Sequence, residues 1–188
     1  MITDLKVNPE NKKLYYEKGY WTDETLNDVW SKQAAAFADR EYVADDLGVR
    51  LTYGEIDDKA ARLASWLRDH GVQNGDVVSI QMAPWSEFAI LYVACLKVGA
   101  VIHPLPVTFN AEDLVYAMNL VESKAFLTST FHHKTNFEEQ ALAIVGDVPT
   151  LIADNICVHD KMKPAQNCIT LEQIYENYEP YTGEAGSK

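Results

Sequence analysis

Residues 75–105 read GDVVSIQMAPWSEFAILYVACLKVGAVIHPL, and this stretch decides the class of fold. It contains two β-prone runs, Val77 to Met82 and Val101 to Pro104. Between them, Pro84 to Val98 predicts a helix, because proline is favoured at a helix start and Gly99 can end the helix. Apolar residues on nearly every side of this helix indicate burial on more than one face. Strand, buried helix and strand in this order predict a βαβ unit with parallel strands.

The chain beyond this unit continues the alternation. Further strands are predicted at Ala125 to Ser129, Thr150 to Ala153 and Ile156 to Val158. The sequence therefore predicts an α/β fold, with a predominantly parallel sheet flanked by helices. Three more helices are predicted where a capping residue stands three positions before an acid or amide. These starts are Asn110-x-x-Asp113, Thr135-x-x-Glu138 and Thr170-x-x-Gln173.

The first part of the chain predicts a helix, a hairpin and a second helix. Apolar spacing indicates an amphipathic helix from Thr22. Two β-prone runs, Tyr42 to Ala44 and Val49 to Leu51, flank a turn-rich break and predict an N-terminal β-hairpin. The segment Thr52-Tyr53-Gly54-Glu55 has the form of a capping box, so a helix is predicted to begin there and to end at Gly71.

The composition indicates one globular domain. The chain has 188 residues, of which 47% are hydrophobic and 23% charged, a balance typical of a packed core rather than of disorder. Lys and Arg number 16 against 28 Asp and Glu, which gives a net charge of −12. This acidic balance argues against a nucleic-acid surface and a polybasic membrane anchor, since both need clustered positive charge. Residues 1–178 are assigned to an α/β subdomain, and the polar, Gly-rich residues 179–188 to a linker that leads to a further part of the polypeptide.

The cysteines and apolar runs bear on the cellular compartment. Cys95, Cys157 and Cys168 form no C-x-x-C pair, which favours a reducing setting. The first eleven residues lack the apolar run of a secretory signal. The longest apolar run, Phe88 to Leu96, is far shorter than the ~20 residues that a membrane-spanning helix needs. We therefore predict a cytoplasmic protein with no membrane span.

Patterns that carry chemistry are nearly absent. The turn Ala83-Pro84-Trp85-Ser86 has no glycine and lacks one amide hydrogen, which argues against a dinucleotide site. Residues 183–188, GEAGSK, lack the spacing of a phosphate loop. Cys157, His159 and Cys168 could supply three zinc ligands, but no fourth ligand follows at metal spacing, and buried thiols with an edge histidine explain them better.

The remaining polar and aromatic candidates also have structural explanations. A histidine pair is assigned to a solvated loop, two carboxylate pairs to a hairpin turn and an outer helix face, and three aromatic residues to the core. We therefore predict no catalytic, cofactor-binding or metal-binding residue in this chain. The sets are His132 with His133, Asp45 with Asp46, Asp57 with Asp58, and Trp85 with Phe88 and Tyr92.

Four segments resemble motifs of the adenylate-forming superfamily, which includes acyl-CoA synthetases, peptide-synthetase adenylation domains and luciferases. LTYGEI at 51–56 is similar to L-[TS]-Y-x-E-L, and LKVGAVIHPL at 96–105 to L-K-x-G-A-x-x-x-P-L. Between them, GDVVSI at 75–80 resembles G-D-x-V-[AS]-[IL]. EDLVY at 112–116, followed by SKA at 123–125, resembles the next helix and strand. The resemblance implies the amino-terminal part of the large domain of such an enzyme.

Shorter segments indicate the subgroup. YEKGYW at 16–21 and WSEF at 85–88 resemble bacterial short- or medium-chain fatty acyl-CoA synthetases, whereas GYW at 19–21 is also similar to dihydroxybenzoate–AMP ligases. The resemblance implies a ligase that uses Mg and ATP to convert a carboxylic acid to an acyl-adenylate, and then transfers the acyl group to coenzyme A. The family's phosphate loop, magnesium-binding Thr-Glu, ribose-binding Asp and catalytic Lys are all expected beyond Lys188. The chain alone is therefore predicted to be inactive.

Several alternatives stay open at this point. The chain could be the corresponding part of an aryl-acid AMP ligase, a complete non-catalytic binding module with the same fold, or a stand-alone nucleotide-binding domain. The resemblance implies two partners, the remainder of the chain's own polypeptide and a carboxylic acid substrate. If the sheet normally packs against an absent part, an exposed apolar patch would drive self-association.

Overall fold

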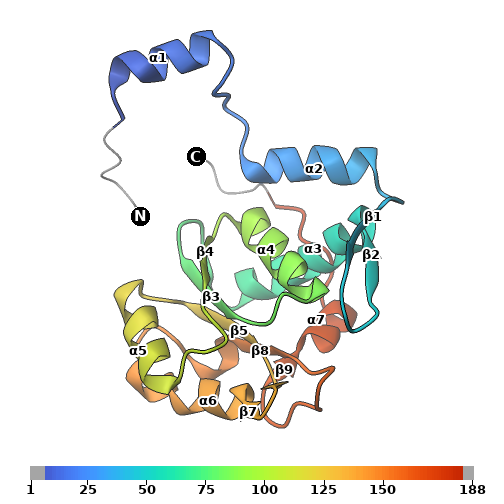
Figure 1. The fold of residues 1–188 in the computed structure, drawn as a ribbon, viewed down its shortest axis with the longest axis vertical. Helices are drawn as coiled ribbons and strands as arrows, with labels where there is room; N and C mark the ends of the chain where they lie inside the picture. The colour runs from blue at the N-terminus through green and yellow to red at the C-terminus, as the bar shows by residue number, and fades with distance from the viewer. Residues whose placement is uncertain (1–6, 184–188) are drawn as a thin grey trace.

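A five-stranded sheet lies at the centre of the computed structural model, which describes residues 7–183 (Figure 1). Its strands are β3 (Val77–Gln81), β4 (Val101–Pro104), β5 (Ala125–Ser129), β8 (Ile156–His159) and β9 (Ile169–Thr170). They lie in the order β4-β3-β5-β8-β9, and every neighbouring pair is parallel. The predicted parallel α/β fold is confirmed, although β9 was not predicted.

Helices cover both faces of this sheet (Figure 1). On one face, α3 (Tyr53–Asp69), α4 (Ser86–Val98) and α7 (Leu171–Asn177) supply the first hydrophobic core. On the other, α5 (Ala111–Leu120) and α6 (Phe137–Ala143) supply a second core. Helix α4 is buried on more than one face, as predicted, because it packs against the sheet, α3 and α2, whereas the face that carries Phe88 and Tyr92 is only partly covered.

The capping residues at Thr52 fix the start of α3, as predicted. The Thr52 hydroxyl accepts a hydrogen bond from the backbone N–H of Glu55 at 3.2 Å, and the Glu55 carboxylate accepts one from Thr52 N–H at 2.8 Å. Gly71 has φ +83°, the left-handed conformation expected just beyond a helix end. The predicted hairpin is also confirmed, with β1 (Glu41–Ala44) antiparallel to β2 (Arg50–Thr52).

The first amphipathic helix begins later than predicted. α2 spans Leu26–Ala36, and Thr25 rather than Thr22 caps it. Thr25 forms a capping box with Asp28, so it satisfies the free N–H groups of the first turn better than Thr22 could. Similarly, α4 begins at Ser86 and not at Pro84.

Two elements differ from prediction after β5. The helix expected from Thr135 begins at Phe137 with Asn136 as its cap, because Thr135 pairs in a short hairpin of β6 (Phe131–His132) and β7 (Thr135–Asn136). The strand expected at Thr150 to Ala153 is absent. Leu151 is buried in the second core there, but the segment runs into a 3₁₀ turn, η2 (Ala153–Asn155), directly before β8. A preceding 3₁₀ turn, η1 (Val145–Asp147), follows α6.

The two ends of the described chain differ in how far they contact the rest of the fold. α1 (Pro9–Glu17) was not predicted, and Figure 1 shows it apart from the sheet, with no buried residue. Near the other end, Tyr181 N–H donates to Ala61 O at 3.0 Å and the Ser65 hydroxyl donates to Glu179 O at 2.7 Å, so this segment lies along α3. Of the predicted linker 179–188, residues 184–188 lie outside the described residues. Within 7–183 no helix is both long and apolar enough to cross a membrane.

Candidate functional site

A ligand site in this fold is expected at the carboxyl edge of the sheet. In open α/β sheets, ligands bind outside the carboxyl ends of the strands, where the strand order reverses. The chain passes from β3 to β4 on one side and then returns to β5 on the other side of β3. The reversal therefore lies at the carboxyl ends of β3 and β5, beside the end of β8.

Buried polar side chains at this edge hold loops in place. The Gln81 side-chain amide donates to two backbone carbonyls in the loop after β4, both at 3.1 Å. The Thr128 hydroxyl donates to Gln81 O at 2.8 Å, and the Thr130 hydroxyl donates to Lys163 O at 2.7 Å. These groups are satisfied by backbone partners, so they serve the scaffold.

A buried charged cluster lies next to them. Glu87, in the first turn of α4, is 3% exposed and forms an ion pair with Lys161, which follows β8. His159, at the end of β8, is also 3% exposed, and its Nε2 atom lies 3.8 Å from Glu87 Oε2, too far for a hydrogen bond. The His159 ring packs edge-on against Trp85, with 5.1 Å between ring centroids. We call Glu87, His159 and Lys161 the buried triad after its two buried members, Glu87 and His159, whereas Lys161 reaches the surface.

The pKa values in the buried triad follow from burial and from neighbouring charge. Burial lowers the pKa of His159 below its ordinary value, and the negative charge of Glu87 offsets only part of that effect. Burial alone would raise the pKa of Glu87, but the hydrogen bond from Lys161 and the adjacent imidazole lower it on balance. The triad thus contains an ionised acid beside a neutral histidine at neutral pH.

The structure corrects the predictions for the histidines and cysteines. His159 is not an edge histidine, since it lies under Trp85 and Glu87. Cys157 is buried in the first core, whereas Cys168 packs against the second. His132 is half-buried near Trp85 rather than solvated, while His133 is exposed in a tight turn with φ +52°. Among residues 7–183, no group of three or more His, Cys, Asp or Glu side chains could hold a metal ion.

An aromatic groove of about 500 Å³ adjoins the triad. Trp85 connects the two, because it lines the groove and also packs against His159 of the triad. Trp85 is buried as predicted, and Phe88 is half-buried against the first core, whereas Tyr92 is 41% exposed, so the prediction of a core position is wrong for Tyr92. The aromatic groove is lined by Leu26, Val29, Trp30, Gln33, Tyr42, Tyr53, Pro84, Trp85, Phe88, Ala89, Tyr92, Val93 and Leu96.

Asp57 fixes the shape of the aromatic groove and is more than the solvated carboxylate that was predicted. One oxygen of Asp57, on α3, accepts a hydrogen bond from Trp30 Nε1 at 2.7 Å. The same oxygen lies 2.7 Å from Lys97 Nζ at the end of α4. Asp57 therefore ties α2 and α4 to α3, and the groove lies between α2 and α4.

We expect Asp57→Ala to lower the free energy of unfolding by about 2 kcal/mol, because it removes two charge-assisted contacts and leaves a half-buried lysine unpaired. Urea unfolding and a red shift of the tryptophan emission measure the effect. The matched control is Asp58→Ala, whose ion pair with Arg62 is exposed to solvent and should contribute much less to stability. Equal losses in the two variants would contradict the role given to Asp57.

The N-terminus of α4 does not fit a nucleotide phosphate. Asp45 Oδ2 accepts the hydrogen bond of Ser86 N–H at 3.0 Å, so a carboxylate already takes the position that an anion would occupy. Pro84 offers no N–H. Burial acts to raise the pKa of Asp45, but its bonds from Ser86 and the hairpin backbone lower it on balance, which keeps it charged. Asp45 thus caps a helix, and the described residues provide no fitting site here for ATP or Mg.

Comparisons with known proteins agree with the fold. The family model described as AMP-binding enzyme matches residues 30–182. The medium-chain fatty-acid–CoA ligase of Escherichia coli is 33% identical over 174 residues, which cover 93% of this chain and 30% of that protein. The 2,3-dihydroxybenzoate–AMP ligase of Bacillus subtilis is 27% identical, over 88% of this chain and 30% of that protein.

Solved structures support the same fold. The apo structure of MbtA from Mycobacterium smegmatis superimposes with a TM-score of 0.78 at 23% identity, over 96% of this chain and 32% of that one. A putative long-chain-fatty-acid CoA ligase from Rhodopseudomonas palustris gives a TM-score of 0.69 at 26% identity, over 87% of this chain and 39% of that one. The chain spans about a third of the length of the relatives it matches.

Proposed function

Since this chain belongs to the AMP-binding enzyme family, we propose that it is the amino-terminal portion of an ATP-dependent acid–thiol ligase. In this proposal, residues 1–178 are the first α/β subdomain of the ligase, and 179–188 lead to the segment that binds the nucleotide. The whole enzyme would form an acyl-adenylate from a carboxylic acid and ATP, and would then transfer the acyl group to coenzyme A. The observation that carries the proposal is the family match over residues 30–182.

The proposed substrate is a short- or medium-chain fatty acid. Support comes from the E. coli medium-chain fatty-acid–CoA ligase, which is similar over nearly the whole chain at 33% identity. An aryl acid is the second candidate, since the 2,3-dihydroxybenzoate–AMP ligase of Bacillus subtilis is similar at 27% identity. The acceptor in either case is proposed to be a thiol, that of coenzyme A in the first candidate.

The described residues are proposed to act as scaffold. The carboxylate of Asp45 at the start of α4 and the backbone-satisfied polar groups at the carboxyl edge leave no fitting phosphate site there. The sites for ATP, Mg and coenzyme A are therefore proposed to lie outside this chain. The aromatic groove and the buried triad are not proposed as catalytic.

Carboxylate-dependent exchange of pyrophosphate into ATP tests the proposal. A polypeptide extended beyond Lys188 should exchange with a panel of aliphatic acids and show a maximum at short or medium chain length, whereas the 188-residue chain should show no exchange. Exchange with aryl acids alone would favour the second candidate. A coding sequence that stops after Lys188, instead of continuing into a [ST]-[ST]-G-T-x-G-x-P-K-like stretch, would refute the proposal.

A further inference from the structure

Residues 8–21 form a compact unit that we call the aromatic arm. It consists of α1 and a turn in which Tyr20 and Trp21 fold back on the helix, with both N–H groups donating to Tyr15 O at 2.9 and 3.2 Å. The Trp21 ring packs edge-on against Tyr15, with centroids 5.2 Å apart, and against Tyr16 at 6.2 Å. The arm is therefore ordered by its own contacts and can dock without refolding.

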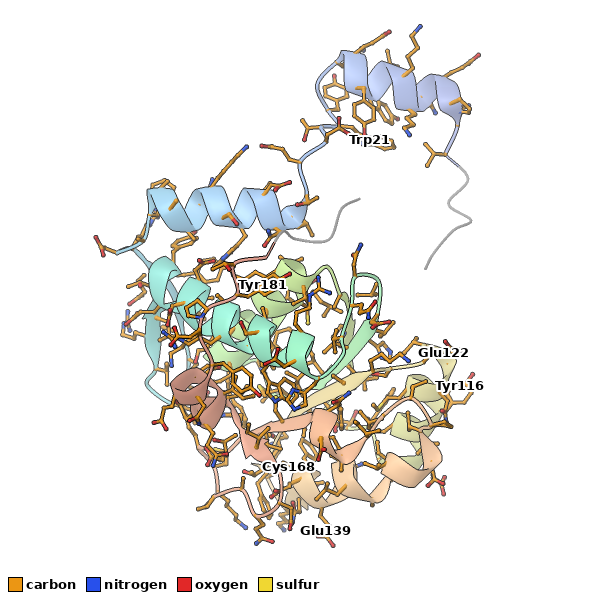
Figure 2. All side chains as sticks on the ribbon, turned by 180° about the vertical axis from the view of Figure 1, so that it is seen from behind. Trp21, Tyr116, Glu122, Glu139, Cys168 and Tyr181 are labelled. Atoms are coloured by element: carbon orange, nitrogen blue, oxygen red, sulfur yellow. The ribbon has the colours of Figure 1, made fainter. Side chains whose placement is uncertain are left out.

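The aromatic arm exposes an apolar surface that the rest of the described chain does not bury. No residue of α1 is buried, Tyr20 is 69% exposed, and Trp21 and Leu14 are both exposed. Figure 2 shows Trp21 beside α1, well apart from the two cores. Burial of exposed apolar surface of this kind is favourable, by about 25 cal/mol for each Å² removed from water.

The aromatic groove offers a matching surface close to the arm. Leu26 at its rim is 67% exposed, and Tyr92 and Val29 in its wall are also exposed. Only residues 22–25 separate Trp21 from Leu26, and four residues span at most ~14 Å. The arm therefore reaches the groove of its own chain without unfolding α1 or α2. A tether this short gives an effective concentration in the millimolar range.

Charge favours the aromatic arm, rather than a second copy of the chain, as the occupant of the aromatic groove. Residues 7–21 carry three lysines and two glutamates, a net charge of +1, whereas the whole chain carries −12. A mildly basic arm is attracted to an acidic body, while two acidic bodies repel each other. In the arrangement of Figure 1, which we call open because the arm lies apart from the groove, the Tyr16 hydroxyl donates an exposed hydrogen bond of 3.4 Å to Asp23, which is long for this type of bond.

We propose that the aromatic arm is a strap that closes over the aromatic groove of the same chain. Closure moves the backbone of residues 22–24 and places Trp21 and Tyr20 against Leu26, Phe88 and Tyr92. Figure 1 shows the open arrangement, from which the closed one differs by rotation of the arm as a unit. The strap covers the apolar surface that would otherwise drive self-association.

Limited trypsin cleavage after Lys18, together with small-angle X-ray scattering, tests the strap. The wild-type chain should be a monomer with a smaller radius of gyration than the open arrangement. Leu26→Asp should release the arm, enlarge the radius and speed cleavage about tenfold. This variant keeps the fold, because Leu26 is exposed and an acid suits the first turn of α2. Tyr92→Asp should have the same effect from the opposite wall.

The matched controls replace the same residue types, a leucine and a tyrosine, by aspartate at exposed positions outside the groove. Leu120→Asp and Tyr116→Asp alter residues of α5 that are each 73% exposed, and both should cleave as the wild type does. Equal cleavage in all five proteins, or a wild-type scattering curve that fits the open arrangement, would overturn the proposal. So would a dimer whose protection rises with protein concentration, because that result would place the arm on a second copy.

Discussion

Glu138→Ala is expected to lower the free energy of unfolding by about 3 kcal/mol, although the residue lies in a short helix away from the site. Its carboxylate accepts hydrogen bonds from three successive backbone N–H groups of the loop before β9, at 3.0 Å from Gln166, 2.7 Å from Asn167 and 2.9 Å from Cys168. Hydrogen bonds to a charged group contribute about 1.5–3 kcal/mol each. We expect a loss smaller than the sum of the three, because Gln166 and Asn167 are exposed and water can replace the carboxylate at their N–H groups. Urea unfolding measures the loss.

The Cys168 thiol gives this prediction a second readout. Burial raises the pKa of Cys168 to about 12, and the charge of Glu138 and a hydrogen bond to it act in the same direction. Removing the carboxylate should therefore lower the pKa of this thiol and speed its reaction with a disulfide reagent. Cys95 and Cys157 are fully buried and should stay unreactive in the folded chain.

Glu139→Ala is the control for Glu138→Ala. Glu139 is exposed and hydrogen-bonds only locally, to the Asn136 side chain, so its loss should change stability by less than about 0.5 kcal/mol. Figure 2 shows Glu139 and Cys168 on the same side of the molecule, so both variants test one region. If the two variants were equally stable, the loop before β9 would not depend on the carboxylate.

The elements that could be predicted from sequence are those with local signals. Capping boxes at Thr52, Asn110 and Thr170 each join residues three positions apart, and all three occur in the structure. The parallel sheet was predictable because its strands alternate with helices along the chain. Thr150 to Ala153 misled the prediction, because a buried Leu151 gives the same apolar signal in a turn as in a strand.

The candidate site could not be predicted, because its contacts join distant parts of the chain. Glu87 and Lys161 are 74 positions apart, and only the register of β5 with β8 brings the end of β8 to the start of α4. Trp30 and Asp57 are 27 positions apart on two helices. From sequence alone, Glu87 and Asp57 look like solvated surface carboxylates, and no local pattern separates a carboxylate that is buried or that bridges two helices from one that is solvated.

The buried triad is expected to make the stability of the chain depend on pH between about 7.5 and 5.5. Because burial lowers the pKa of His159, the unfolded chain binds this proton more readily than the folded chain does. The stability that the neutral imidazole provides is complete above its ordinary pKa of 6.5 and is lost as the pH falls below that value towards the folded pKa. One such group changes the free energy of unfolding by at most about 1.4 kcal/mol per pH unit.

His159→Asn removes this titration, so the loss of stability between pH 7.5 and 5.5 should be smaller than in the wild type. The groups that face His159 are Glu87, Lys161, Asp160 and Glu172, and of these Glu87 stays charged over this range because the hydrogen bond from Lys161 helps to lower its pKa. Burial also lowers the pKa of His103 and His132, which leaves a residual slope in the variant. His133→Asn, at an exposed turn position with φ +52° that asparagine tolerates, is the control and should keep most of the wild-type slope, because it leaves His159 in place and removes only a minor contribution to the lowered pKa of His132. Urea unfolding at three pH values measures all three proteins, and a slope in His159→Asn equal to that of the wild type would mean that the buried imidazole does not titrate in this window.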